Sequence, residues 1–162
     1  MLARLGFTTL QAGLLLLWAL YLACVVATNV TDALKSLGML PASWTLASGN
    51  YGLVATTTSA HGIPPGVAAF LFAGVIAWEA LASWMFFRAW ATFRRTADGH
   101  APEVTAAFTV SLALWGAFLI VDEMLIAYAY APAHARILIG QLLSLLVVRV
   151  SAGELAGVRR AR

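Results

Sequence analysis

The sequence predicts an all-α integral membrane protein: an antiparallel four-helix bundle with a partly helical outer loop between spans 1 and 2. Of the 162 residues, 62% are hydrophobic and 10% are charged, and the mean hydropathy is +0.86, far from the composition of a soluble domain. Four apolar segments are separated by turn residues, and their basic residues gather at alternate ends. At 17.2 kDa the chain has room for a single membrane domain, residues 1–162, and no separate soluble one.

The first span is predicted over residues 5–27, long enough as a helix to cross a hydrocarbon core of about 30 Å. Arg4 before an apolar run resembles a signal peptide, but the run is too long and lacks a convincing cleavage site. We therefore expect a retained span. Gln11 and Asn29 fall on one helical face, which Asp32 continues, so this face either looks into the bundle or places Gln11 near the inner interface.

The outer loop is predicted over residues 29–62. Thr31 is positioned to cap a short helix over residues 32–37, and Ser43 to cap a second helix beginning at Trp44. The loop is too apolar for a disordered linker, so we expect it to cover the bundle mouth or to lie in the membrane interface.

The second span, residues 64–90, begins at a Pro-Pro pair, which a first helical turn tolerates. Ala69, Ala73 and Ala77 form a small-residue row suited to close helix packing. Glu79 lies just past the middle of this segment, which makes it the deepest charge in the sequence.

The third span, residues 103–131, carries two adjacent acids in its outer third, Asp122 and Glu123. A charged side chain in a bilayer core costs on the order of 3 kcal/mol by insertion scales, so both acids need partners. Pro132 then breaks the helix, and the fourth span follows over residues 134–150.

The distribution of Lys and Arg predicts the orientation in the membrane. One side receives Arg4, Arg88, Arg94, Arg95, Arg149, Arg159, Arg160 and Arg162, and the other receives Lys35 and Arg136. We therefore expect a multi-pass membrane protein with both termini cytoplasmic.

Seven polar positions form the candidate polar network or ion site: Asn29, Asp32, Lys35, Glu79, Asp122, Glu123 and Arg136. The favoured interpretation is a structural latch in which the acids at positions 122 and 123 pair with the residues from the outer loop and with the arginine. The other interpretation is an outward-facing acidic site for a proton, a cation or a positively charged partner. Glu79 should lie about 10 Å further in, as a hydrogen-bonded acid or as a step on a proton path.

Several chemical classes are not expected. The single Cys24 rules out an internal disulfide and a cysteine metal cluster, and no histidine falls at the centre of a span to anchor a haem. Catalytic motifs and phosphate-binding loops are absent from the sequence, so we expect no enzyme activity, metal or cofactor. The basic residues follow span ends, so nucleic acid is not an expected partner either.

Four short motifs, Asn29-Val30-Thr31-Asp32, Ser48-Gly49-Asn50-Tyr51, Trp78-Glu79-Ala80-Leu81 and Asp122-Glu123, carry a resemblance. Together they resemble an uncharacterised bacterial family of predicted small integral membrane proteins with four spans. The resemblance implies a bacterial inner-membrane protein whose polar positions include those named above, and it implies no reaction or substrate.

The leading functional hypothesis is a non-catalytic accessory or anchoring subunit of a larger membrane complex, with energy metabolism as the expected setting. Its partners would be the lipid bilayer and other membrane subunits. A small ion- or proton-handling transporter or channel that uses the buried carboxylates is the alternative. A lipid- or quinone-binding component, with Trp18, Trp78 and Trp115 lining an apolar pocket, is the second alternative.

Overall fold

The computed structural model describes residues 2–150 of the chain, and throughout that range the regular structure is helical. The helices are α1 (Leu2–Ser36), α2 (Asn50–Ala60), α3 (Pro65–Thr96), α4 (Pro102–Met124) and α5 (Ala131–Arg149). All except α2 are long and apolar enough to cross a membrane. The predicted all-α class and the four apolar helices are confirmed. Arg159, Arg160 and Arg162, which entered the count of basic residues, lie outside the described residues.

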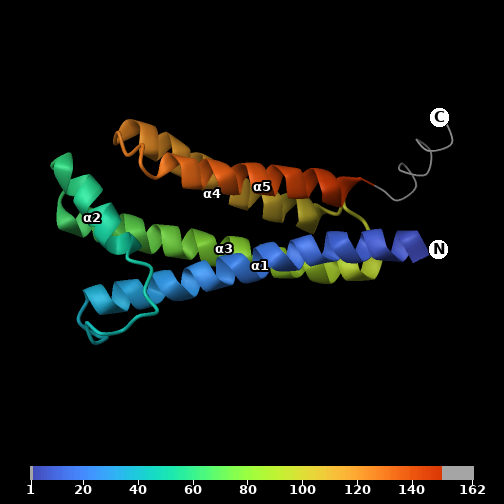
Figure 1. The fold of residues 1–162 in the computed structure, drawn as a ribbon, viewed down its shortest axis with the longest axis horizontal. Coiled ribbons are helices and arrows are strands. Elements are labelled where there is room, and N and C mark those ends of the chain that lie inside the picture. Colours follow the sequence, from blue (N-terminus) through green and yellow to red (C-terminus); the bar gives the residue numbers. More distant parts are fainter. Residues whose placement is uncertain (1, 151–162) are drawn as a thin grey trace.

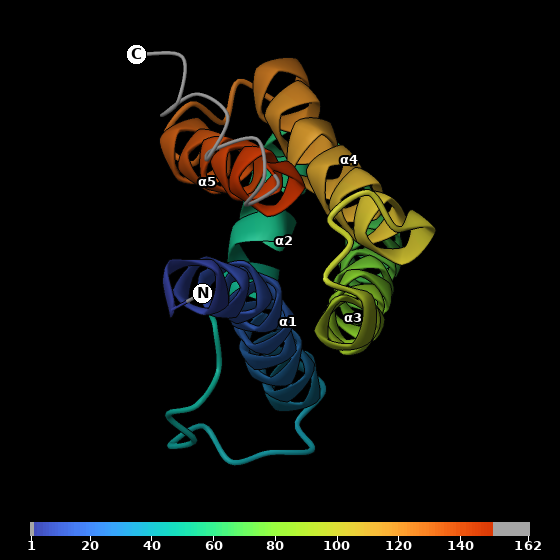
Figure 2. The same cartoon turned by 90° about the vertical axis from the view of Figure 1, so that its right-hand side faces the viewer.

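The four long helices lie side by side along the long axis of the molecule (Figure 1). The colour gradients of α1 and α4 run one way along this axis, and those of α3 and α5 run the other way. Viewed end on, the long helices are arranged in a ring in the order α1, α3, α4, α5, and α2 lies behind them at the far end (Figure 2). We call this far end the α2 end.

Aromatic and aliphatic side chains fill the interior between α1, α3 and α4. Phe86 of α3 and Phe108 of α4 are both buried and meet edge to face, with ring centroids 5.0 Å apart. Leu15 and Leu22 of α1 belong to the same buried cluster. Such interdigitation supplies the dispersion contacts that hold helices together where the hydrophobic effect is weak.

At the end opposite α2, a single amide holds α1 against the end of α5. Gln11 Nε2 lies 2.9 Å from the carbonyl oxygen of Val148 and 3.0 Å from that of Val147. These are among the last carbonyls of α5, which have no partner within their own helix. Gln11 is buried, so the interpretation in which its face looks into the bundle is the one that the structure supports.

The outer loop differs from the prediction. Residues 32–37 do not form a separate capped helix, because α1 continues through Asp32 to Ser36 and the Thr31 hydroxyl donates back to the carbonyl of Thr28. Residues 37–49 contain no helix, so the helix predicted to begin at Trp44 is wrong. Helix α2 starts at Asn50 instead.

Helix α4 ends at Met124, well before the predicted end of the third span at residue 131. The amide of Ala127 donates to the carbonyl of Asp122 at 2.7 Å, and the amide of Ile126 donates to that of Glu123. This is the Schellman pattern of helix termination, in which one residue takes a left-handed conformation. Here that residue is Ile126, with φ of 53°, where glycine is the usual choice.

Candidate functional site

The deepest acid is held by an asparagine of the neighbouring helix. Glu79 of α3 and Asn29 of α1 are 2% and 1% exposed, and Asn29 Nδ2 donates to Glu79 Oε2 at 2.8 Å. The oxygen of the same amide, Asn29 Oδ1, accepts from Asn50 Nδ2 at 2.9 Å. One asparagine thus links a carboxyl group inside α3 to the first residue of α2.

The start of α2 is capped by a carboxylate from another helix. Asp32 of α1 accepts a hydrogen bond from the backbone amide of Tyr51 at 2.7 Å, and the hydroxyl of Ser48 donates to the same oxygen at 3.2 Å. The Ser48 hydroxyl also accepts from the amide of Asn50. Gly49, with φ of 78°, lets the chain turn into the helix. An acid at a helix start satisfies its free amides and matches its dipole.

Further contacts fix the loop to the end of α1. Lys35 Nζ donates to the carbonyl of Trp44 at 3.0 Å, and the amide of Ser48 donates to the carbonyl of Thr28 at 3.2 Å. The Thr31 hydroxyl contacts the carbonyl oxygen of Leu46. The loop therefore lies against α1 and carries α2 back over the helix ends.

A second polar group occupies the junction of α4 and α5. Asp122 Oδ2 lies 2.6 Å from His134 Nδ1, and the carboxylate is buried. The imidazole ring stacks on Phe118, with centroids 4.6 Å apart. Glu123 is exposed and accepts from the hydroxyl of Tyr128 at 3.3 Å. The two adjacent acids thus have separate environments, as their 100° offset around a helix requires.

The structure groups the seven candidate residues differently from the prediction. Asn29 and Glu79 are joined, while Asp32 and Lys35 bond the outer loop and the start of α2. Among the described residues, no hydrogen bond or ion pair joins Asp122 or Glu123 to the other five positions, and Arg136 has no such partner at all. The partners expected for the acid pair are therefore replaced by a histidine and a tyrosine.

Four residues of these groups were not among the candidate site residues: Ser48, Asn50, Tyr128 and His134. Each was placed in a loop or near a span end, and nothing in its local sequence identified a partner. The only available signal for the histidine was its position just past a predicted helix break, where a reversal of the chain returns residues toward the preceding helix.

The three tryptophans considered for an apolar pocket do not share one. Trp115 is buried in the core, and the indole of Trp78 donates to the carbonyl of Val110 at 3.0 Å. Trp18 instead lines a crevice between α1 and α5.

The polar groups among residues 2–150 do not include a metal site, since no cluster of three or more His, Cys, Asp or Glu side chains there could hold a metal ion. The groups do form a hydrogen-bonded path from Glu79 through Asn29 and Asn50 to the outer loop. Comparisons with protein-family models, curated proteins and solved structures found no match.

Proposed function

We propose that the chain crosses a bacterial inner membrane four times as an antiparallel bundle and serves as a non-catalytic accessory or anchoring subunit of a larger membrane complex. The four apolar helices support insertion, because only a bilayer suits so much exposed apolar surface. Arg94 and Arg149 end α3 and α5 away from the α2 end, whereas Lys35 and Arg136 lie at the α2 end. This distribution supports cytoplasmic termini.

One observation carries the role of a subunit: the small-residue row of α3 is exposed. Ala69, Ala73 and Ala77 are all exposed, while α3 packs on α1 and α4 through a different face that includes Ala82 and Phe86. In membranes, small residues concentrate where helix backbones approach one another. The row predicted for close packing is thus available to a helix of another subunit.

The test replaces small side chains of that row by larger ones and measures whether the partner subunit still co-purifies. The native protein, purified from its own membrane in a gentle detergent, should carry a stoichiometric partner subunit. The double variant Ala73→Leu, Ala77→Leu should lose it, because added methylenes keep the helices apart. The control is Ala113→Leu, at an exposed small position of α4, which should retain the partner. A free monomer or a bare homo-oligomer from the native membrane contradicts the proposal, and so does partner retention in the double variant.

A second function, proton or cation handling, is favoured by the hydrogen-bonded path that begins at Glu79. A buried ionisable group inside a spanning segment is a default candidate for such a role. Protein reconstituted in vesicles should then show proton or cation flux that falls in Glu79→Gln. The matched control Glu103→Gln, in the first turn of α4, should leave the flux intact. Equal flux in the native protein and in Glu79→Gln excludes this function.

A further inference from the structure

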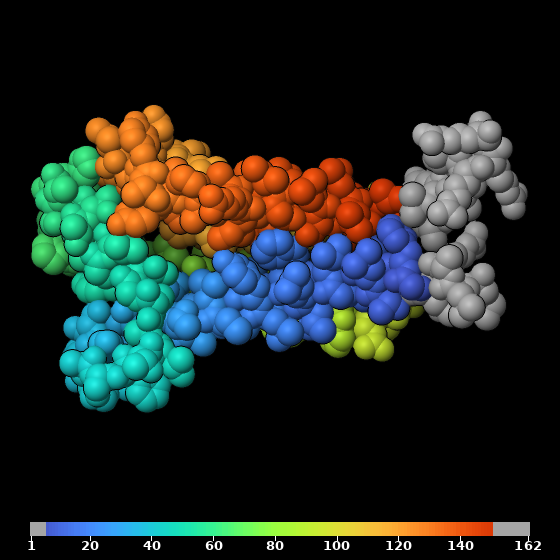
Figure 3. Space-filling view, viewed as in Figure 1, coloured from blue at the N-terminus to red at the C-terminus, as the bar shows by residue number. Residues whose placement is uncertain are grey.

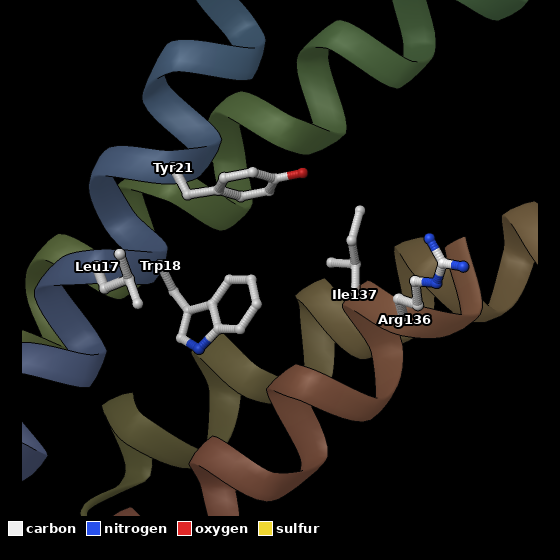
Figure 4. A pocket seen from close by; sticks show the side chains of 5 residues that line it. All are labelled: Leu17, Trp18, Tyr21, Arg136 and Ile137. Carbon is white, nitrogen blue, oxygen red and sulfur yellow. The ribbon is translucent and has the colours of Figure 1, made fainter. Parts of the chain in front are cut away.

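A crevice opens between α1 and α5. Its walls are Leu17, Trp18 and Tyr21 of α1 and Arg136 and Ile137 of α5, and its volume is about 260 Å³. Figure 4 shows the two sets of side chains facing each other across the gap between the helices. In the space-filling view, the seam between α5 and α1 is hollowed nearer the α2 end, where deeper atoms are visible (Figure 3).

The seam is closed at one end and open at the other. Gln11 ties α1 to the last carbonyls of α5, and further along the indole ring of Trp18 lies against Gly140. A β-carbon added at this glycine would sit 3.6 Å from the ring, an ordinary van der Waals distance, so the indole lies beside the backbone of α5. Beyond Trp18 the crevice begins, with Tyr21 on one wall and Ile137 on the other.

The crevice combines apolar walls with one cation that lacks a counterion. Arg136 is exposed, and no described residue accepts a hydrogen bond from its guanidinium group. The carboxylate of Asp122, at the junction of α4 and α5, is engaged by His134. Figure 4 shows the guanidinium group at one end of the crevice and the hydroxyl of Tyr21 across from it. Arg136 lies in the second turn of α5, at the α2 end, where a spanning helix meets the lipid headgroups.

We propose that this crevice binds an anionic phospholipid, with the headgroup phosphate on Arg136 and an acyl chain along Leu17, Trp18 and Ile137. A guanidinium group matches a phosphate by paired hydrogen bonds, and its positive charge favours an acidic headgroup. The aliphatic and indole side chains that line the crevice are available to contact an acyl chain, because no helix of the described chain covers them there. The proposal is independent of the accessory role, because it uses a different face of the molecule.

The test compares two lipids that differ in headgroup charge alone. The full-length protein, delipidated in a mild detergent, is titrated with phosphatidylglycerol or phosphatidylcholine of identical acyl chains, and bound lipid is counted by native mass spectrometry. Phosphatidylglycerol should bind more tightly, and Arg136→Gln should weaken it by about fivefold, as for one basic side chain lost at an anionic headgroup. Arg95→Gln, a basic residue in the last turn of α3, should bind as the native protein does.

A second pair of variants tests the acyl chain site. Ile137→Trp fills the crevice and should lower phosphatidylglycerol binding, whereas Ile139→Trp, at an exposed position outside the crevice, should not. Arg136→Gln, Arg95→Gln and Ile139→Trp should keep native thermal stability, because these side chains are exposed. Equal affinity for the two lipids overturns the proposal. Undiminished phosphatidylglycerol binding in Arg136→Gln or in Ile137→Trp overturns it as well.

Discussion

The contact between Asn29 and Glu79 gives the sharpest test of how this molecule is held together. Asn29→Leu leaves the buried carboxyl group of Glu79 without its described donor, and Glu79→Met leaves the asparagine amide without its acceptor. Both replacements are apolar and of similar size, so little cavity or overpacking should accompany the lost hydrogen bond. The double variant removes both polar groups together.

The magnitudes follow from the burial of the pair. Leaving a buried polar group unsatisfied costs about 1–3 kcal/mol, so each single variant should lose that much stability. Asn29→Leu also breaks the bond from Asn50, but that side chain is only half-buried and water can replace the acceptor. The double variant leaves no unsatisfied polar group between α1 and α3. Its loss of stability should therefore be smaller than the summed losses of the two single variants by about 1 kcal/mol.

Unfolding in mixed micelles with increasing sodium dodecyl sulfate, followed by helical circular dichroism, measures each free energy. A matched cycle pairs Asn29→Leu with Gln141→Leu, whose amide donates to Ser111 between α4 and α5, and this cycle should be additive. A coupling energy within about 0.3 kcal/mol of zero for the first cycle would refute the reasoning.

Three further outcomes are expected. Gly99→Ala should destabilise the protein by about 1–3 kcal/mol, because its β-carbon would lie 2.0 Å from the carbonyl oxygen of Val148; thermal unfolding measures this. Ile126→Gly should stabilise it by about 1 kcal/mol in the same assay by relieving the left-handed conformation. Asp32→Ala should speed amide hydrogen exchange in α2 by about fivefold to tenfold, because it removes the cap on Tyr51.

Each of these outcomes has a matched control. Gly74→Ala, at a helical glycine whose β-carbon would meet nothing within 4 Å, should be neutral or slightly stabilising. Leu125→Gly, next to the left-handed residue at a position with φ of −99°, should not stabilise. In Asp32→Ala, exchange in α4 should stay at the native rate. A stable Gly99→Ala, a destabilised Ile126→Gly or unchanged exchange in α2 would each contradict its own prediction.

The four long helices could be predicted because the apolar runs that produce them are local features of the sequence. Four apolar runs of sufficient length, separated by Pro-rich and polar turns, are enough to predict four long helices. The residues at which the helices begin and end depend on less local interactions. Helix α4 ends at Met124 through a hydrogen-bond pattern whose left-handed residue is usually glycine but here is Ile126, so the sequence carried no signal for this end. Helix α2 starts where a carboxylate from α1 meets its first amides, a partner 19 residues away along the chain.

The sequence was enough to predict most of the residues of the candidate site, but not which of them bond to one another. An acid inside an apolar run needs a partner wherever it lies, which is why Glu79 and Asp122 could be singled out. The choice of partner depends on helix rotation and on the path of the loop. Opposite charges at one membrane level predicted that Asp122 pairs with Lys35 and Arg136, yet its observed partner is the ring of His134. Glu79, which was expected as a hydrogen-bonded acid further in, accepts from the neutral amide of Asn29.

The two ends of the molecule are stabilised by different means. Away from α2, one neutral amide, Gln11, binds free carbonyls at the close of α5, and Gly99 allows the turn between α3 and α4 to approach them. At the α2 end, Asn29 is bonded to Asn50 and to Glu79 at once, so α2 cannot leave its place without removing a partner from the chain that holds the buried acid. The position of α2 and the hydrogen bonding of Glu79 are therefore linked through Asn29. Accelerated exchange in α2 should accompany Asn29→Leu as it accompanies loss of the cap, whereas α5, held at its far end by Gln11, should be unaffected.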